Sequence, residues 1–168
     1  MSFTKDNTIP QNAICVPDVL LPAHADMYAW AVNACDQFTG DMSYWRDVEN
    51  LTAGKLSTYH LIFPEIYLKD RPEERIKEIN AAMYDYLNGG VFKEVHGFIL
   101  VERSTPSGTR TGIVLAIDLE EYSFVQADRA LIRSTEATIL DRLPPRVKIR
   151  KNAPLELPHI MLLYEDKE

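Results

Sequence analysis

The sequence predicts an α+β fold, in which a mixed sheet that includes a β-hairpin carries helices packed on it. This prediction depends on a strongly periodic helix at residues 72–87, on two apolar runs around a turn at residues 96–119, and on the mixed order of helical and strand-like segments. The chain has 168 residues, 46% of them hydrophobic, which is enough for one compact core. We therefore expect residues 1–168 to form a single domain.

Two helices are predicted in the first third of the chain. Residues 25–38 place apolar side chains at the spacing of a helix that packs on one side, and Asp26 is available as its N-cap. Cys35 falls on the apolar side of this helix, where we expect a reduced, packed thiol. A second, short helix is predicted for residues 42–51.

The clearest predicted helix runs from about Pro72 to Leu87. Its apolar stripe consists of Ile76, Ile79, Met83 and Leu87. Asp70 and Glu73 have the spacing of a capping box, Pro72 suits a first turn, and the sequence Asn-Gly-Gly at residues 88–90 ends the helix.

Strands are predicted from runs of β-branched and aromatic residues. Residues 58–68 form one such run, and we expect the strand to end near Phe63 because Pro64 cannot donate to a ladder. Residues 96–119 contain two runs around the sequence Thr-Pro-Ser-Gly, which is typical of a hairpin.

The last forty residues are predicted to combine strands with one short helix. Residues 131–133 are predicted to be the end of a strand. Thr135 is placed to cap a helix that continues to Arg142, and the prolines at residues 144 and 145 stop this helix. Residues 146–150 alternate polar and apolar side chains, which is the pattern of a strand, and residues 159–164 form a last apolar strand.

Composition argues against a membrane protein and against a general nucleic-acid binder. No apolar run approaches the roughly 20 residues that a membrane helix needs. The net charge of -7 opposes phosphate backbones, which are bound through a surplus of lysine and arginine. We expect a soluble, cytoplasmic protein whose partner is a small anionic or phosphorylated molecule. The sequence is also compatible with a homo-oligomer.

Positive charge is nevertheless concentrated in residues 131–151, which hold six cations and only two carboxylates. The six cations are Arg133, Arg142, Arg146, Lys148, Arg150 and Lys151. On one face of a strand such charges must stay solvated, pair with acids or meet an anion. Arginine forks and helix N-termini both bind phosphate, so an anion site built on Thr135 to Thr138, with Arg133 close by in sequence, is one interpretation, and a solvated charged face is the other.

Glu136 is the candidate catalytic residue of this segment. In the first turn of a helix it would complement the helix dipole, which is its ordinary structural role. Its functional role would be that of a general base, or of a carboxylate that holds Mg²⁺ beside a phosphate. Neighbouring arginines would lower the pKa of Glu136, and this favours metal binding or transient proton acceptance over acid catalysis.

Three further side chains are secondary candidates. His60 and Glu65 flank the end of the predicted strand at residues 58–63, where ligand-binding groups often gather, although a packed histidine is the more common outcome. Asp36 ends the first predicted helix, where a solvated position is the more common outcome.

Three segments, VNACDQFTGDMSYW, STYHLIFPEIYL and IRSTEATILDRLPPRVKIRKNAPLELPHIMLL, together resemble the domain of unknown function 1015 (DUF1015) family in its clostridial-type branch. The resemblance extends from about residue 14 onward. It implies family positions at Asp36, at the Ser-x-x-His and Pro-Glu pair of residues 57–65, and at Arg133, Thr135, Glu136 and Thr138. The family usually has histidine where this chain has Thr135.

The resemblance also implies a distant relationship to the ParB and sulfiredoxin-like superfamily, whose members include kinases of free serine. Family members look longer than this chain, so residues 1–168 would be an N-terminal portion of a longer protein.

The function that follows is phosphoryl transfer to a small hydroxyl substrate, such as free serine, from a nucleotide or pyrophosphate. Glu136 and His60 would be catalytic, and Glu136 would hold Mg²⁺. The phosphate-binding and substrate-binding candidates are Arg133, Thr135, Thr138, Arg142, Arg146, Lys148, Asp36 and Glu65. The alternative is a domain that binds an anion or a protein partner without turnover, and in a third interpretation the cluster is a solvated face and the function lies elsewhere.

Overall fold

The computed structural model describes residues 8–9, 13–123, 125, 130–133, 140, 143–157 and 159–163. The chain divides into two compact units, and each is built from two separate stretches of sequence. Unit 1 comprises Met1–Leu21 and Phe92–Thr138, and unit 2 comprises Pro22–Val91 and Ile139–Glu168. Helices and small sheets together confirm the α+β class, and no helix among the described residues is long and apolar enough to cross a membrane.

Unit 1 contains the strands. The strands β1 (Thr8–Ile9), β2 (Ile14–Cys15) and β7 (Ala116–Ile117) form one antiparallel sheet in the order β1-β2-β7, and β3 (Asp18–Pro22) pairs with β4 (Phe92–His96). After the short 3-10 helix η4 (Leu119–Glu121), β8 (Tyr122–Ser123) pairs in parallel with β9 (Ile132–Arg133). In the described part of the chain the strands therefore form several small sheets, and the expected single mixed sheet is not present.

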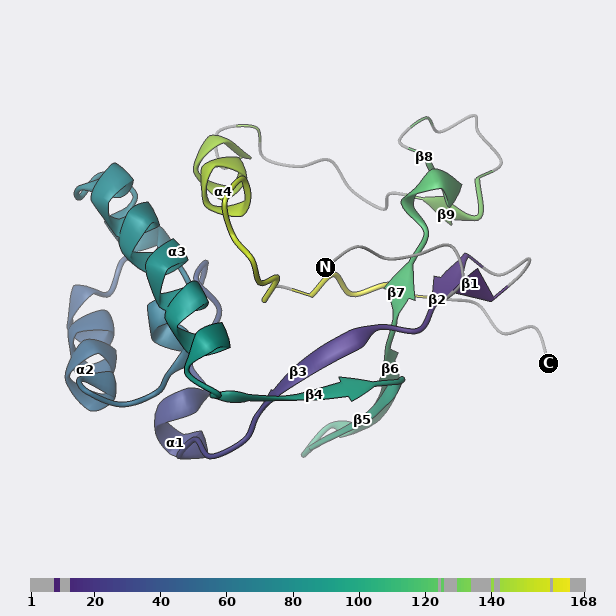
Figure 1. Cartoon of the computed structure of the whole chain (residues 1–168), viewed down its shortest axis with the longest axis horizontal. Coiled ribbons are helices and arrows are strands. Elements are labelled where there is room, and N and C mark those ends of the chain that lie inside the picture. Colours follow the sequence, from purple (N-terminus) through teal and green to yellow (C-terminus); the bar gives the residue numbers. More distant parts are fainter. Residues whose placement is uncertain are drawn as a thin grey trace. The chain divides into compact units, whose positions relative to one another are not determined.

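The predicted hairpin is confirmed. Strands β5 (Ile99–Thr105) and β6 (Gly108–Val114) are antiparallel and run side by side (Figure 1), in a register that places Thr105 opposite Gly108 across a two-residue turn. Gly108 has φ +138, a conformation that glycine adopts without the steric cost of a Cβ atom. The turn sequence thus fixes the register of the hairpin, as expected from local chemistry.

Unit 2 contains the helices and most of the core. It consists of α1 (Met27–Trp30), α2 (Met42–Thr52), two 3-10 helices, η2 (Thr58–Leu61) and η3 (Glu65–Tyr67), then α3 (Pro72–Asn88) and α4 (Leu143–Arg150) (Figure 1). The most deeply buried side chains of this unit come from several of these elements and the segments between them: Ala29, Trp45, Val48, Thr52, Ser57, Leu61, Phe63, Tyr67, Ile76, Ile79 and Met83. Full burial of an aliphatic side chain of this size contributes about 1.5–3 kcal/mol, so α3 is anchored by its apolar stripe.

The predicted helix at residues 72–87 is confirmed, but its N-terminal cap is not a capping box. Arg71 occupies the cap position in the left-handed region, with φ 46 and no capping bond from its side chain. Asp70 instead accepts from Arg75, whose Nη2 lies 2.7 Å from Asp70 Oδ2. The predicted end at the Asn-Gly-Gly sequence is correct, and Gly90 is left-handed with φ +69.

The predicted helix at residues 25–38 is wrong beyond Trp30. Asp26 caps α1 through Tyr28 N at 3.1 Å as expected, but the chain becomes extended at Ala31. Thr58 Oγ1 donates to Trp30 O at 2.7 Å. In a continued helix Trp30 O would accept from Ala34 N, so the tertiary bond from Thr58 occupies a carbonyl at the end of α1.

The predicted strand at residues 58–63 is also wrong, because residues 58–61 form η2, and η3 follows at residues 65–67. Ser57 Oγ caps η2 by accepting from Tyr59 N at 3.1 Å. The apolar side chains Leu61, Phe63 and Tyr67 are buried, so the segment folds into the core through side-chain contacts and pairs with no strand in the described part of the chain. Burial of this apolar run overrides its strand propensity.

Two C-terminal strands were predicted wrongly. Residues 146–150 belong to the helix α4, and Pro144 and Pro145 lie in its first turn, where no intrahelical N–H bond is required. Residues 159–163 have no regular structure, and Ile160, Leu162 and Leu163 are exposed there. Of the predicted helix from Thr135 to Arg142 the structure describes only Leu140, which is exposed, so the helix stays a prediction.

The conformation of Gly90 yields a stability prediction with a matched control. Gly90→Ala should lower the free energy of unfolding by about 1 kcal/mol, because a Cβ atom is strained at φ +69 although the space around it is open. Gly40 also has open space and is not left-handed. Gly40→Ala should therefore leave stability unchanged or raise it by up to about 1 kcal/mol. Urea unfolding of both variants measures the difference, and equal losses would contradict this account of the C-terminus of α3.

Candidate functional site

The structure places the predicted site residues very unevenly. Glu136, Thr135, Thr138 and Arg142 lie outside the described residues, so their predicted roles stay predictions. Arg133 ends β9 in unit 1 and is exposed. The remaining candidates, Asp36, His60, Glu65, Arg146 and Lys148, all belong to unit 2, where their surroundings can be described.

The three cations of α4 each bind a carboxylate. Arg146 Nη2 donates to Glu65 Oε1 at 3.0 Å, Lys148 Nζ to Glu73, and Arg150 to Glu156 with Nη2 and Oε1 at 2.7 Å. The helix turns Lys148 away from Arg146 and Arg150, whereas a strand would have aligned all three on one face. In this part of the chain the positive charge is therefore largely paired with acids.

The pair between Glu65 and Arg146 differs from the other two in burial. The side chain of Glu65 is only 11% exposed and that of Arg146 is 42% exposed, whereas the partners in the other two pairs are all about half exposed or more. Exposed pairs contribute roughly 0–1 kcal/mol, but a buried carboxylate depends on its cation. The pair also orients the guanidinium, because one of its nitrogens is fixed on Glu65 while the rest of the group remains partly exposed.

Cys35 and Asp36 complete what we call the Glu65 cluster, which is defined as Cys35, Asp36, Glu65 and Arg146. The backbone N of Glu65 donates to Cys35 O at 2.8 Å, so the turn after α1 is fixed to η3. The pKa of the Cys35 thiol is raised, first by burial and then by the charges of Asp36 and Glu65, while Arg146 acts to lower it. A protonated, partly buried thiol is a packing group, as expected, and not a nucleophile.

His60 belongs to a separate hydrogen-bond network centred on the hydroxyl of Tyr86. His60 Nδ1 lies 2.9 Å from that hydroxyl, Ser57 N donates to it at 3.0 Å, and it donates to Ser57 O at 3.2 Å. All three bonds form together if Nδ1 carries the proton, which leaves Nε2 as the lone-pair nitrogen. Burial lowers the pKa of His60 and raises that of Tyr86, so both groups are neutral near pH 7.

The individual candidates were visible in the sequence, but their grouping was not. Glu65 and Arg146 are 81 residues apart, and no spacing rule connects them. Tyr86 was missed, because it lies next to Leu87 and the predicted stripe favoured Leu87 as the buried residue. The polar residues Ser57 and His60 within an apolar segment were the signal for a residue such as Tyr86, because buried polar groups need hydrogen-bond partners.

The described part of the chain thus presents an α+β protein with a half-buried carboxylate–arginine pair and a neutral histidine in its helical unit. The chain belongs to the family described as "Protein of unknown function (DUF1015)", whose model matches residues 17–168. Neither a protein of curated function nor a solved structure matches the chain. The clostridial-type branch and the ParB and sulfiredoxin-like relationship stay predictions.

The Tyr86 network predicts a specific loss of stability. Tyr86→Phe should lower the free energy of unfolding by about 1–3 kcal/mol, because it removes the hydroxyl to which the buried Ser57 N–H donates. Tyr84 lies one residue beyond Met83 on the same helix and is 52% exposed. Tyr84→Phe should change stability by less than about 0.5 kcal/mol. Denaturant unfolding compares the two, and equal effects would mean that the network contributes nothing.

The lowered pKa of His60 predicts a pH dependence of stability. Burial lowers the pKa of the folded state below the ordinary value of 6.5, so below that pH the unfolded state binds more protons. Stability should therefore fall as the pH falls below about 6.5. Urea midpoints across about pH 5 to 7.5 measure this. His60→Gln should flatten the dependence, and an unchanged slope would contradict the role of burial.

Proposed function

We propose that this chain belongs to a phosphoryl-transfer enzyme that phosphorylates a small hydroxyl substrate, such as free serine, with a nucleotide or pyrophosphate as donor. The observation that supports the proposal most directly is the Glu65–Arg146 pair. A guanidinium that is fixed by a largely buried carboxylate, with part of its fork still exposed, is a preorganised phosphate-binding group. Preorganised cations of this kind stabilise the charge on a transferred phosphoryl group.

The other residues take roles that follow from their chemistry. Arg146 would bind the phosphates of the donor, and Asp36, exposed beside the buried Glu65, would approach the substrate. Glu136 would accept the substrate proton, and Arg133, Thr135, Thr138 and Arg142 would contact phosphate. Lys148 is paired with Glu73, so it would contribute to the local potential more than to a direct contact. His60 is bonded to Tyr86 and would contribute through Nε2.

The proposed step transfers one phosphoryl group. The substrate hydroxyl oxygen attacks the terminal phosphorus of the donor, and the bridging P–O bond breaks. The bridging oxygen leaves with the electron pair as the shortened phosphate. The hydroxyl proton passes to the carboxylate of Glu136 and then to solvent, so that charge and atoms balance.

Magnesium enters the proposal with the donor. Among the described residues no group of three or more His, Cys, Asp or Glu side chains is arranged for a metal ion. Mg²⁺ is usually held by one or two carboxylates together with substrate phosphates and water, and Asp36 or Glu136 would supply such a carboxylate. Bound Mg²⁺ would neutralise charge on the donor phosphates.

A second candidate function is a domain that binds an anion or a partner without turnover. The pairing of Lys148 with Glu73 and of Arg150 with Glu156 favours it. An external anion can bind such a cation only if it displaces the carboxylate that is already paired with it. This displacement suits reversible recognition better than catalysis. The neutral His60 and the protonated Cys35 are consistent with this candidate as well.

Arg146 provides the test that compares the two functions, with Arg150 as matched control on the same helix. Pyrophosphate, ATP, ADP and phosphoserine, with and without Mg²⁺, are screened for thermal stabilisation of the protein. A ligand at 100 times its dissociation constant should add roughly 2.7 kcal/mol of stability. Arg146→Met should abolish the shift, and Arg150→Met should retain it.

Turnover separates the enzyme from the binding domain. Transfer of labelled phosphate to serine should occur in the wild type, and Glu136→Gln should keep ligand binding while it abolishes transfer. Stabilisation without transfer in the wild type would favour the binding domain. An absence of stabilisation by every compound would contradict the enzyme and the binding of a small phosphate, and would leave a domain that binds a partner.

A further inference from the structure

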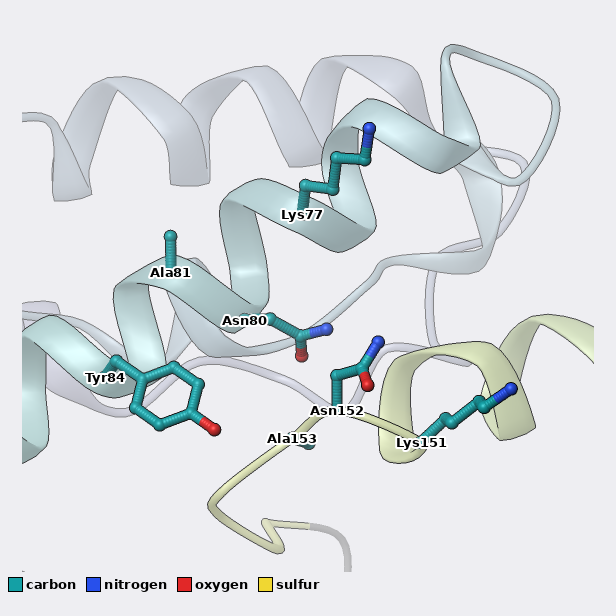
Figure 2. Close-up of a pocket in the computed structure, with 7 residues that line it drawn as sticks. All are labelled: Lys77, Asn80, Ala81, Tyr84, Lys151, Asn152 and Ala153. Atoms are coloured by element: carbon teal, nitrogen blue, oxygen red, sulfur yellow. The ribbon is translucent and has the colours of Figure 1, made fainter.

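A cavity of about 510 Å³ lies in unit 2 between α3 and the turn that follows α4 (Figure 2). Lys77, Asn80, Ala81 and Tyr84 line it from α3, and Lys151, Asn152 and Ala153 line it from the turn. Its volume is within the range of small-molecule sites, roughly 300–1,000 Å³. The cavity shares no lining residue with the Glu65 cluster or with the Tyr86 network.

The charge of the lining is positive. It includes two lysines and no carboxylate, although the chain as a whole has a net charge of -7. Two of the carbonyls at the end of α4 accept backbone bonds, Val147 O from Lys151 N at 2.9 Å and Arg150 O from Ala153 N at 3.3 Å. Lys151 also opposes the partial negative charge of that helix end. A small anion is therefore the charged group that this cavity favours.

Asn80 supplies a second and independent observation. Its side chain projects from α3 toward the side where Asn152 lies (Figure 2), and the residue is only 9% exposed. Asn80 Oδ1 is buried and has no hydrogen-bond partner among the described residues. A buried acceptor without a donor costs free energy, and such groups are rare in folded proteins. A hydroxyl or amino group brought by a ligand would remove that cost.

We propose that this cavity binds a small phosphate ester that also carries a hydroxyl group. The amines of Lys77 and Lys151 are apart in the free protein (Figure 2), and their flexible side chains turn to the phosphate on binding. The hydroxyl donates to Asn80 Oδ1, with the Tyr84 hydroxyl and the Asn152 carboxamide as further polar contacts. Because Asn80 Oδ1 is covered in the free protein, the Asn80 side chain turns toward the ligand when the ligand binds. The site does not depend on the phosphoryl-transfer function proposed above.

Two probes that differ in their hydroxyl groups test the ligand class. Calorimetric titration of the full chain uses glycerol 1-phosphate and propyl phosphate. Glycerol 1-phosphate should bind about tenfold more tightly, since one hydrogen bond to a buried acceptor separates the two. Equal affinities, or no binding of either probe, would overturn the proposal.

Variants of the lysines test the location. The double variant Lys77→Met/Lys151→Met should weaken both probes by about tenfold or more. The charge-matched control Lys55→Met/Lys69→Met changes two exposed lysines elsewhere in unit 2 and should leave both affinities unchanged. Arg146→Met should also leave them unchanged, and a loss there would overturn the proposal by moving the binding to the Glu65 cluster.

Asn80 is tested in two ways, so that a folding defect in one variant does not remove the test. Asn80→Leu should abolish the difference between the two probes, provided that its circular dichroism matches the wild type. In the wild-type protein, the side-chain amide NMR signals of Asn80 and Asn152 should shift with glycerol 1-phosphate. Unshifted side-chain signals at saturating glycerol 1-phosphate would contradict the proposed contact.

Discussion

The hydroxyl of Tyr86 is the constraint on which the arrangement of unit 2 depends. It accepts from the backbone N–H of Ser57, which is fully buried, and it donates to Ser57 O, which also accepts from His60 N at 3.3 Å. This fixes the start of η2 against α3. From there the chain runs through η2 and Pro64 to Glu65, which binds Arg146 of α4 and thereby connects residues 81 positions apart. The hydrogen bonds between Ser57 and Tyr86 therefore help to position Glu65, and with it Arg146, in unit 2.

Charge in this protein serves internal attachment as much as recognition. The cations of α4 reach back to η3 and to the first turn of α3, and they pair with acids in an otherwise acidic chain. The exposed pair of Lys148 with Glu73 contributes little on its own, while the less exposed Glu65 needs its partner. A basic segment in an acidic protein can therefore serve to attach one element to another through ion pairs. Arg146 attaches α4 to η3 in this way, and its guanidinium is still partly exposed to an anion.

Sequence reasoning succeeded where the determinants are local. The stripe of Ile76, Ile79 and Met83 defines α3, and the turn before Gly108 defines the hairpin, because both patterns lie within a few residues. It failed where a distant partner decides. The hydroxyl of Thr58 binds Trp30 O at the end of α1, and no feature of residues 25–38 reveals that contact.

The same distinction explains α4 and the candidate site. Two prolines stop a helix that precedes them and start one that follows, so Pro144 and Pro145 were compatible with either assignment. Glu65 and Arg146 were each recognisable as candidates from residue type. Their pairing, the part played by Tyr86, and the cavity at Asn80 depend on packing between elements, which sequence spacing does not encode.

The division of the chain has a consequence for the order in which it can fold. Unit 1 needs Phe92–Thr138 to join Met1–Leu21, and unit 2 needs Ile139–Glu168 to join Pro22–Val91. During synthesis the first part of each unit is made before the intervening segment and the second part. Joining the two parts then closes a long loop, and the entropy lost on closing that loop opposes their association. The apolar side of α3 is made long before α4 arrives. The nascent protein therefore passes through a stage in which the helical unit is built but not yet closed.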